Sequence, residues 1–283
     1  MITRRSFMTL MALAPFALQL DAQEAAAQTE EVRDVLMGTF VQMKGVGVPR
    51  QSLVETISHM KQLEHIFSRF TPEGELATLN REGVLRRPSK EFSAVMPAAQ
   101  GAYVETDGAF DVSVLPVLLH FEKFQRPLSS EEQERFRQSV GFDKVESGGR
   151  DLRLKNPGMK LTLDGIAKGY IIDRAAERLR DKGCARVLVN VGGDIYCGKS
   201  NDGWGVGIYD PLRDKLSRKL SLQDAAVCTS GNYVNFYSPD KKLHHIIDPR
   251  SLSSPANLTR ATVVAGSTMR ADILSPTRFI KGL

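Results

Sequence analysis

The sequence LTLDGIAKGYIIDRAAERLRDKGCARVLVNVGGDIYCG, residues 161–198, decides how the centre of this chain folds. The apolar run Leu161–Leu163 predicts a short β-strand, and Asp164-Gly165 predicts a turn whose aspartate caps the next helix. From Ile166 to Lys182, apolar residues recur at helical spacing, which predicts an amphipathic helix. Val187–Val191 then predicts a buried strand. The stretch therefore indicates a strand, a tight turn, a helix and a second strand.

The two ends of the predicted helix carry further signals. At its start, free backbone N–H groups, the positive end of the helix dipole and Lys168 come together, which suits a phosphate group. At its end, Gly183 suits the left-handed position that terminates a helix. Neither GxxxxGK[ST] nor a GxGxxG run after a strand is present. The local pattern is also compatible with ordinary folding, and both interpretations stay open at this point.

The exact residues of this stretch identify a family more specifically than the secondary structure they predict. GIAKGYIID followed by VNVGGDI closely resembles the FAD:protein FMN transferases of the ApbE family. Five more blocks carry the resemblance from about Val35 to Ser275, namely MGTFV, FSRFTPEGELATLN, GAFDVSVLPV, TSGNY and HHIIDPR. The resemblance implies an α+β fold, with a mixed, largely antiparallel sheet flanked by helices. It also implies two intimately packed lobes with FAD in the cleft between them.

The same resemblance implies an enzyme that transfers FMN from FAD to a serine or threonine hydroxyl of an acceptor flavoprotein, with release of AMP. One acceptor of this kind is an electron-transfer subunit of a respiratory system. Such phosphoryl transfer requires Mg²⁺. Lys168 is expected to clamp phosphate. His245 is expected to act as the base or to position the hydroxyl, because an unperturbed imidazole titrates near neutrality.

The resemblance also assigns residues to the flavin and to the metal. The flavin contacts are Met37, Phe70, Ala109, Phe110, Asp111, Thr162, Lys168 and Ile247. The metal ligands it implies are the carbonyl oxygen of Gly165 and the carboxylate of Asp272, and such hard oxygen ligands suit Mg²⁺. Ser275 is the third candidate ligand. From the residues alone, Met37 is equally a core methionine beside a bulge glycine. Phe70 keeps the aromatic face of the tyrosine usual at its position but lacks the hydroxyl.

Three features depart from the family pattern. Thr162 replaces an acidic residue that contacts FAD, although some branches shift this polarity to the position of Asp164. Pro276 replaces a threonine that ligates the metal, and Ser275 or Thr277 can substitute only if the helix starts differently. The C-terminus at Leu283 is shorter than usual for the family. These departures leave two alternatives to transfer: an FAD pyrophosphatase, or a non-enzymatic flavin carrier or maturation factor without a complete metal site.

The first 27 residues predict a targeting signal. Arg4-Arg5 lies in a twin-arginine pattern, an apolar run continues to Leu20, and Ala25–Ala27 offers a cleavage site. The run is too short to span a bilayer stably. We therefore expect export to the periplasm by the twin-arginine machinery, no membrane span after processing, and one ApbE-like domain over residues 28–283. A Sec signal or an uncleaved anchor is the alternative.

Composition narrows the possible partners. The formal charge is +5, with basic residues dispersed rather than interleaved with aromatics, so we expect no nucleic-acid binding. An anionic dinucleotide is compatible with this charge. Cys184, Cys197 and Cys228 show no metal-ligand spacing and are most simply buried free thiols, with one disulfide as the open alternative.

The remaining pattern predicts elements on both sides of the central stretch. Residues 28–34 are expected to be a loose lead-in. The predicted helices and strands are a strand over 35–43 broken at Met37-Gly38, helices over 52–67, 91–108 and 129–140, short strands within 141–156, strands over 204–210, 216–222 and 262–265, and a last helix from Ala271. The helix over 129–140 begins with Ser-Ser-Glu-Glu, which predicts a capped helix on the surface.

Overall fold

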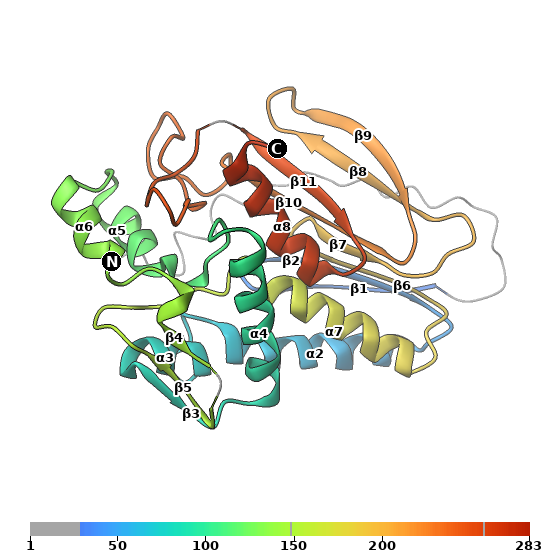
Figure 1. Cartoon of the computed structure of the whole chain (residues 1–283). Helices are drawn as coiled ribbons and strands as arrows, with labels where there is room; N and C mark the ends of the chain where they lie inside the picture. The colour runs from blue at the N-terminus through green and yellow to red at the C-terminus, as the bar shows by residue number, and fades with distance from the viewer. Residues whose placement is uncertain (1–28, 148, 257) are drawn as a thin grey trace.

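The computed structural model describes residues 29–147, 149–256 and 258–283, and its largest element is a six-stranded sheet (Figure 1). Every pairing between its strands is antiparallel. In spatial order, its strands are β1 (Thr29–Leu36), β2 (Thr39–Val46), β6 (Arg186–Val191), β7 (Asp194–Cys197), β10 (Ala225–Gly231) and β11 (Arg260–Ala265). The predicted α+β class is confirmed. The predicted signal, residues 1–27, lies outside the described residues.

The first hairpin corrects the prediction for the N-terminal part of the domain. Strand β1 occupies the segment that was expected to be a loose lead-in, and it pairs with β2 along its whole length. Met37 and Gly38 both have positive φ, 51° and 71°, and form the two-residue turn between the strands. Such turns match the twist of a hairpin. The Met37-Gly38 break is therefore a reversal of the chain and not a bulge in one strand.

Three helices cover one face of the large sheet. They are α2 (Arg50–Phe67), α7 (Ala167–Asp181) and α8 (Thr268–Lys281). The predicted end of α7 is confirmed, because Gly183 has φ +83° and its N–H donates to the carbonyl of Arg180. The N–H of Cys184 donates to the carbonyl of Leu179, which completes the capping pattern. No helix in the described part of the chain is long and apolar enough to cross a membrane.

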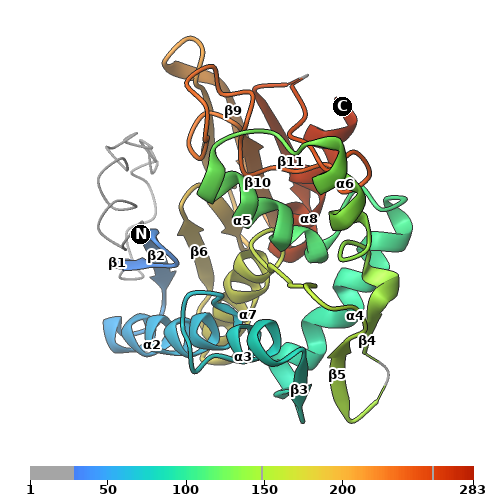
Figure 2. The same cartoon turned by 90° about the vertical axis from the view of Figure 1, so that its left-hand side faces the viewer.

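A smaller region lies beside these helices (Figures 1 and 2). Its elements are α3 (Glu75–Glu82), β3 (Val84–Arg86), α4 (Lys90–Glu105), α5 (Leu115–Phe124), α6 (Ser130–Arg137), β4 (Val145–Glu146), β5 (Asp151–Leu154) and the 3₁₀ turns Val112–Val114 and Phe142–Lys144. A second apolar core joins α5 to the loop between β10 and β11. The predicted cap of α6 is confirmed, because Ser129 Oγ accepts from the N–H of Glu132 while the Glu132 carboxylate accepts from the N–H of Ser129.

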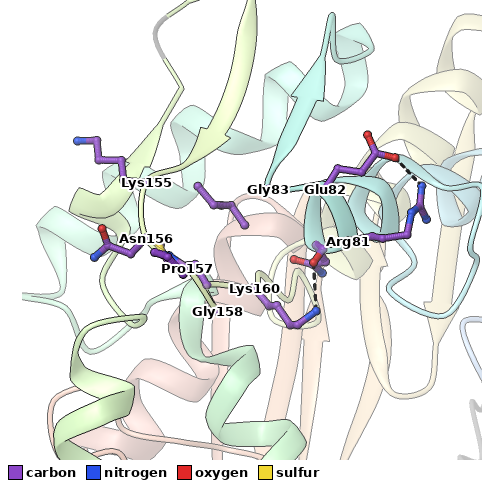
Figure 3. A pocket seen from close by; sticks show the side chains of 11 residues that line it. Arg81, Glu82, Gly83, Lys155, Asn156, Pro157, Gly158 and Lys160 are labelled. Carbon is purple, nitrogen blue, oxygen red and sulfur yellow. Dashed lines mark hydrogen bonds and ion pairs between the residues drawn. The ribbon is translucent and has the colours of Figure 1, made fainter.

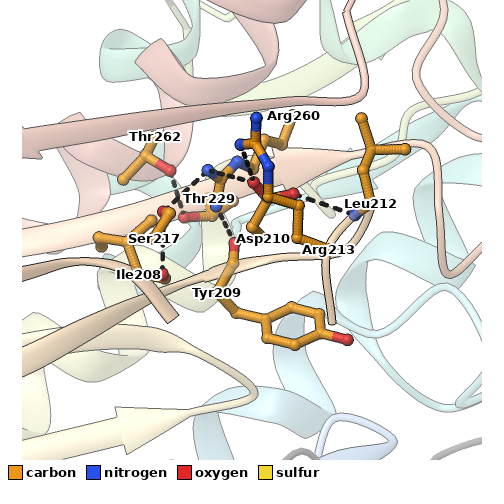
Figure 4. A network of polar contacts seen from close by, with 9 residues as sticks. All are labelled: Ile208, Tyr209, Asp210, Leu212, Arg213, Ser217, Thr229, Arg260 and Thr262. Carbon is orange, nitrogen blue, oxygen red and sulfur yellow. Dashed lines mark hydrogen bonds and ion pairs between the residues drawn. The ribbon is translucent and has the colours of Figure 1, made fainter. Parts of the chain in front are cut away.

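The predicted strand pair after the central stretch is a separate hairpin, β8 (Trp204–Asp210) and β9 (Lys215–Leu222). Arg260 of β11 joins it to the large sheet, as Figure 4 shows. Its guanidinium donates to the carbonyl of Tyr209 and to Ser217 Oγ, 2.9 Å away, and lies 4.0 Å from the Asp210 carboxylate. One arginine thus connects the hairpin to the sheet edge.

The turn before α7 differs from the prediction. Leu161–Leu163 is not a strand, because the Asn80 side chain bonds both the N–H and the carbonyl of Leu161 in place of a neighbouring strand. Asp164 does not cap α7, since the N-cap residue is Ile166 and receives no side-chain hydrogen bond. The Asp164 carboxylate instead lies 3.5 Å from Arg69 Nε. An ion pair between distant segments has replaced the predicted local cap.

Candidate functional site

The N-termini of α7 and α8 meet at Gly169. A Cβ at this position would lie 2.5 Å from both the carbonyl oxygen of Thr268 and the Cα of Met269, so only glycine fits. Each helix also supplies an aspartate to the other. Asp272 Oδ2 accepts from the N–H of Gly169 at 2.9 Å, and the Asp173 carboxylate accepts from the N–H groups of Thr268 and Met269 at 2.8 and 2.9 Å. These reciprocal caps neutralise both positive helix ends.

Lys168 lies directly beside this junction. Its ammonium nitrogen is 2.6 Å from Asp194 Oδ2, and Asp194 Oδ1 accepts from the N–H of Thr229. Burial on its own would lower the pKa of Lys168, but the carboxylates of Asp194 and Asp272 outweigh burial and raise it. The lysine is therefore a permanent cation. Its partner is Asp194, to which no role was assigned from the sequence.

The resulting cluster holds two carboxylates and one ammonium. Burial raises the pKa of Asp272 to about 7, and the neighbouring charge of Asp194 acts in the same direction. Burial also raises the pKa of the adjacent Cys228 thiol well above its ordinary value, so this cysteine is an inert thiol. All three cysteines are buried and free, as predicted. Asp194 and Asp272 both interact with Lys168, so an ionised Asp272 shares one cation with a second carboxylate.

The turn at Gly165 brings three predicted segments together. The Phe110 ring lies 3.2 Å from where a Gly165 Cβ would stand, and Pro276 Cγ lies 3.8 Å from the same point. The N–H of Thr162 donates to the carbonyl of Val112 at 2.8 Å, which joins the GAFD block to the central stretch. Ala109 packs in an apolar cluster that includes residues of the HHIIDPR block and of α8.

Asp111 is buried and has a structural role within its own segment. Its Oδ1 accepts from the N–H of Ser113 at 2.8 Å and caps the short 3₁₀ turn. Burial raises the pKa of its carboxyl against the opposing effect of this hydrogen bond. This carboxylate is expected to accept from the N–H edge of a flavin, and that role stays a prediction.

His245 differs from the unperturbed imidazole that the sequence analysis assumed. Burial lowers its pKa to about 4, so the ring is neutral at physiological pH. Nδ1 lies 3.0 Å from the carbonyl oxygen of Asn235, and because a carbonyl can only accept, Nδ1 must carry the proton. Nε2 is then the unprotonated nitrogen, and its lone pair has no hydrogen-bond partner among the residues that the structure describes. The charges of Asp164 and Lys168 also act on the pKa of this ring, in opposite directions.

Of the predicted metal ligands, Asp272 and Ser275 lie on α8 and Gly165 lies in the turn before α7, and their oxygen atoms are of the kind that fits a hard cation. Asp272 offers its second carboxylate oxygen, and Gly165 and Pro276 adjoin each other. Ser275 Oγ is 2.8 Å from Ser230 Oγ, so this hydroxyl already has a hydrogen-bond partner on β10. Among the described residues, no three His, Cys, Asp or Glu side chains group as metal ligands. A bound Mg²⁺ would therefore depend on one carboxylate with neutral oxygens, and it would supply a second cation beside Asp272.

The other predicted flavin contacts lie in separate surroundings. The N–H of Met37 donates to Glu64 in the last turn of α2, and its side chain packs at the margin of the main core. Phe70 lies in the loop after α2 and is 64% exposed. The Ile247 side chain is buried in the second core, so any contact with flavin falls to its backbone. These three are not in contact with the charged cluster through any hydrogen bond or ion pair among the described residues.

A pocket lies away from all of these residues. It is lined by the turn between α3 and β3 and by the loop over residues 154–160, as Figure 3 shows. Lys160 crosses it and donates to the carbonyl oxygen of Asn80. None of the predicted site residues lines it, so this hollow is not the site that the sequence indicates.

The fold and the cluster define a class of α+β proteins in which an antiparallel sheet supports two helices joined at their N-termini. The chain belongs to the ApbE family, whose sequence profile matches residues 37–283. It is 27% identical over 264 residues to an FAD:protein FMN transferase of Klebsiella pneumoniae, covering 88% of this chain and 81% of that protein. A second FAD:protein FMN transferase, from Haemophilus influenzae, is 29% identical over 243 residues, covering 79% and 70%.

Solved structures agree with this assignment. The ApbE protein of Thermotoga maritima superposes with a TM-score of 0.83 at 28% identity, covering 90% of this chain and 88% of that one. The flavin transferase ApbE of Vibrio cholerae superposes with a TM-score of 0.78 at 26% identity, covering 90% and 87%. The family resemblance seen in the sequence blocks is thereby confirmed.

Proposed function

We propose that this protein is an exported FMN transferase that moves FMN from FAD to a serine or threonine hydroxyl of an acceptor flavoprotein and releases AMP. The observation that carries the proposal is the family match over residues 37–283 together with the cluster of Lys168, Asp194 and Asp272 at the junction of α7 and α8. The relatives named above as transferases support the same chemistry.

In the proposed reaction, the acceptor oxygen bonds to the FMN-side phosphorus of FAD. The bond from that phosphorus to the bridging oxygen breaks, and AMP leaves with the electron pair. Lys168 stays cationic at any physiological pH, which suits contact with phosphate oxygens. His245 is neutral with an unprotonated Nε2, so it can take the hydroxyl proton or hold the hydroxyl in place. Both roles require the anionic substrate to approach the junction.

Asp272, the Gly165 carbonyl and Ser275 are the residues that would hold Mg²⁺. When bound, the ion would neutralise charge on the pyrophosphate and on the departing AMP. The reciprocal cap fixes one oxygen of Asp272 through the N–H of Gly169 and thereby orients the other. The backbone therefore sets the direction of the carboxylate before any substrate binds.

The cellular part of the proposal depends on the first 27 residues. The twin-arginine pattern at Arg4-Arg5 supports export of the folded protein to the periplasm, with residues 28–283 as the exported domain. The acceptor is then an exported or membrane-bound flavoprotein, of which a respiratory electron-transfer subunit is one candidate. FAD loading before export would be compatible with this route.

One reaction mixture tests the activity. Purified protein, FAD, Mg²⁺ and a candidate acceptor are incubated, and mass spectrometry follows the acceptor mass and free AMP. Addition of FMN to the acceptor with one AMP per transfer supports the transferase. AMP and free FMN without an acceptor adduct would identify a pyrophosphatase, which the Pro276 departure keeps as the second candidate. Bound, unconsumed FAD would identify a carrier.

A further inference from the structure

Arg69 connects three segments that are distant in the sequence. It lies in the loop after α2, and its side chain is only 11% exposed. Its Nη2 is 2.7 Å from Glu122 Oε1 in α5, Nη1 is 3.5 Å from Oε2 of the same carboxylate, and Nε is 3.5 Å from Asp164 Oδ2 in the turn before α7. Two carboxylates therefore hold the guanidinium plane from two sides, and the group cannot rotate freely.

The same guanidinium supports an aromatic ring. The central carbon of the Arg69 guanidinium lies 4.2 Å from the centroid of the Phe70 ring, within the range of a cation–π contact. Phe70 is nevertheless 64% exposed. An exposed phenylalanine next to a fixed cation has one face covered and one face available to a flat ligand.

We propose that Arg69 is a positioning residue that holds the Phe70 ring in the plane on which an isoalloxazine ring stacks. The inference rests on the proposed function, because it needs a flavin as the ligand. Through Asp164, the same side chain also ties this ring to the turn that contains Gly165. Lysine could replace the charge but not the planar fork or the flat surface, so the proposal requires arginine specifically.

A purely structural role for Arg69 predicts a different outcome. Loss of a tie between α2, α5 and the Asp164 turn would lower stability and weaken every ligand alike. Loss of a support for Phe70 would weaken only ligands that contain the isoalloxazine ring. Riboflavin, FMN and FAD should then lose affinity together, while AMP should not. Comparison of these four ligands separates the two roles.

The chain offers a matched control. Arg126 forms a similar bidentate pair with Glu132, with both N–O distances at 2.8 Å, and its guanidinium lies 5.5 Å from the Phe124 ring. None of these three is a predicted site residue. Arg126→Lys therefore repeats the same chemical change away from the proposed flavin.

The experiment measures ligand affinity by flavin fluorescence, or by calorimetry for AMP, in the full chain and its variants. Arg69→Lys should weaken FAD and FMN about tenfold and leave AMP affinity close to wild type, while its thermal midpoint should fall because the ion pairs with Glu122 and Asp164 are weakened. Arg126→Lys should change neither affinity. The effect of Arg69→Lys should largely disappear in a Phe70→Leu background, since both changes remove one stacking surface. Glu122→Gln removes the negative charge that pairs with the Arg69 guanidinium but keeps an oxygen that can accept from it. It should therefore also lower the affinity for flavins, by a smaller factor.

Unchanged flavin affinity in folded Arg69→Lys would overturn the inference while leaving the proposed function in place. Equal loss of flavin and AMP affinity in Arg69→Lys and Glu122→Gln would overturn it in favour of a structural tie. Failure of the wild type to bind any flavin would instead overturn the proposed function itself, and the inference with it.

Discussion

At the residue scale, Asp111 is the clearest case in which one side chain has two candidate roles. The residue caps a 3₁₀ turn through Oδ1, and the family resemblance assigns it to the flavin. Asp111→Asn keeps an oxygen that can cap but loses the charge, whereas Asp111→Ala loses both. We expect FAD affinity to fall about tenfold to a hundredfold in both variants, because a charge-assisted hydrogen bond contributes roughly 1.5–3 kcal/mol.

Only Asp111→Ala should also lower the thermal midpoint. The check is a fluorescence titration with FAD alongside a melting curve for each variant, with the exposed Asp240→Ala as the control. Wild-type FAD affinity in folded Asp111→Asn would remove the charge of Asp111 from flavin binding and leave it as a cap.

His245 gives a prediction about pH. Burial depresses its pKa from an ordinary 6.5 to about 4, so the folded state favours the neutral ring. Above pH 6.5 the ring is neutral in both folded and unfolded chains, and its contribution to stability is fully present. As pH falls from 6.5 toward 4, the unfolded chain takes up the proton first, and this contribution is lost.

The neighbouring His244 also has a pKa lowered by burial, so the wild-type slope has more than one source. His245→Asn keeps a donor for the Asn235 carbonyl but cannot take up a proton. We expect the free energy of unfolding of this variant to fall less steeply between pH 6.5 and 4 than that of wild type, by denaturant titration at several pH values. Identical slopes would show that His245 is not buried as neutral imidazole.

At the element scale, the α7–α8 junction depends on a missing side chain. A Cβ at Gly169 would lie 2.5 Å from backbone atoms of α8. The two helices would have to move apart to make room for it, and this movement would disturb the reciprocal caps. We expect Gly169→Ala to lower the free energy of unfolding by about 1–3 kcal/mol, the usual cost of overpacking. Gly101→Ala in α4 is the control, because nothing lies within 4 Å of its added Cβ.

At Gly101 the same substitution should raise stability by roughly 0.5–1 kcal/mol, since alanine is the better helix former. Urea denaturation of both variants provides the measurement. A neutral Gly169→Ala would mean that α7 and α8 can separate at no cost, contrary to the close approach described above.

The sequence predicted elements well where periodicity or a local motif determined them. The helix ending at Gly183 and the capping box at Ser129 both depend on nearby residues, and both are confirmed. The strand expected at Leu161–Leu163 is wrong, because Asn80 satisfies that backbone from about eighty residues away. Helix α5, which follows the GAFD block, was not predicted, since its Leu-Pro start reads as the end of a strand.

The same distinction between local motifs and tertiary contacts applies to the residues of the site. The sequence motifs indicated Lys168, Asp272 and Gly165. In the structure, Lys168 and Asp272 lie where α7 and α8 meet, and Gly165 adjoins α8 in the turn before α7. The partners Asp194, Asp173 and Arg69 were missed because their roles come from tertiary contacts across distant segments. The glycine pair before Asp194 was the one local signal that pointed to such a role. The depressed pKa of His245 could not be predicted either, since burial is a property of the folded chain.

At the scale of the whole molecule, export is a prediction of its own. Arg4→Lys with Arg5→Lys should keep the protein in the cytoplasm, because the twin-arginine receptor recognises that pair. Cell fractionation with an antibody against the folded domain measures this, and a lysine change at Arg33 in β1 serves as the control. Normal periplasmic levels of the double variant would show that another route exports the chain.

The choice between enzyme and carrier depends on Pro276. As proline within α8, it cannot donate to the carbonyl of Asp272, and the Ser275 hydroxyl lies 3.4 Å from that oxygen as a weak replacement. At the position of Pro276, the family resemblance implies a threonine that ligates the metal. Pro276→Ala restores the helix N–H without a hydroxyl, whereas Pro276→Thr restores both. A comparison of the two separates helix repair from a gain of a metal ligand.

We expect weak Mg²⁺-dependent release of AMP in the wild type, because water can occupy the place of one neutral ligand at some cost in affinity. Asp272→Ala should abolish it, since it removes the carboxylate, and Pro276→Thr should lower the Mg²⁺ concentration required for half-maximal turnover. Pro276→Ala should raise thermal stability without that change. The measurement is AMP release against Mg²⁺ concentration at saturating FAD and acceptor. If wild type binds FAD but releases no AMP at high Mg²⁺, and Pro276→Thr behaves like Pro276→Ala, the protein carries flavin and does not transfer it.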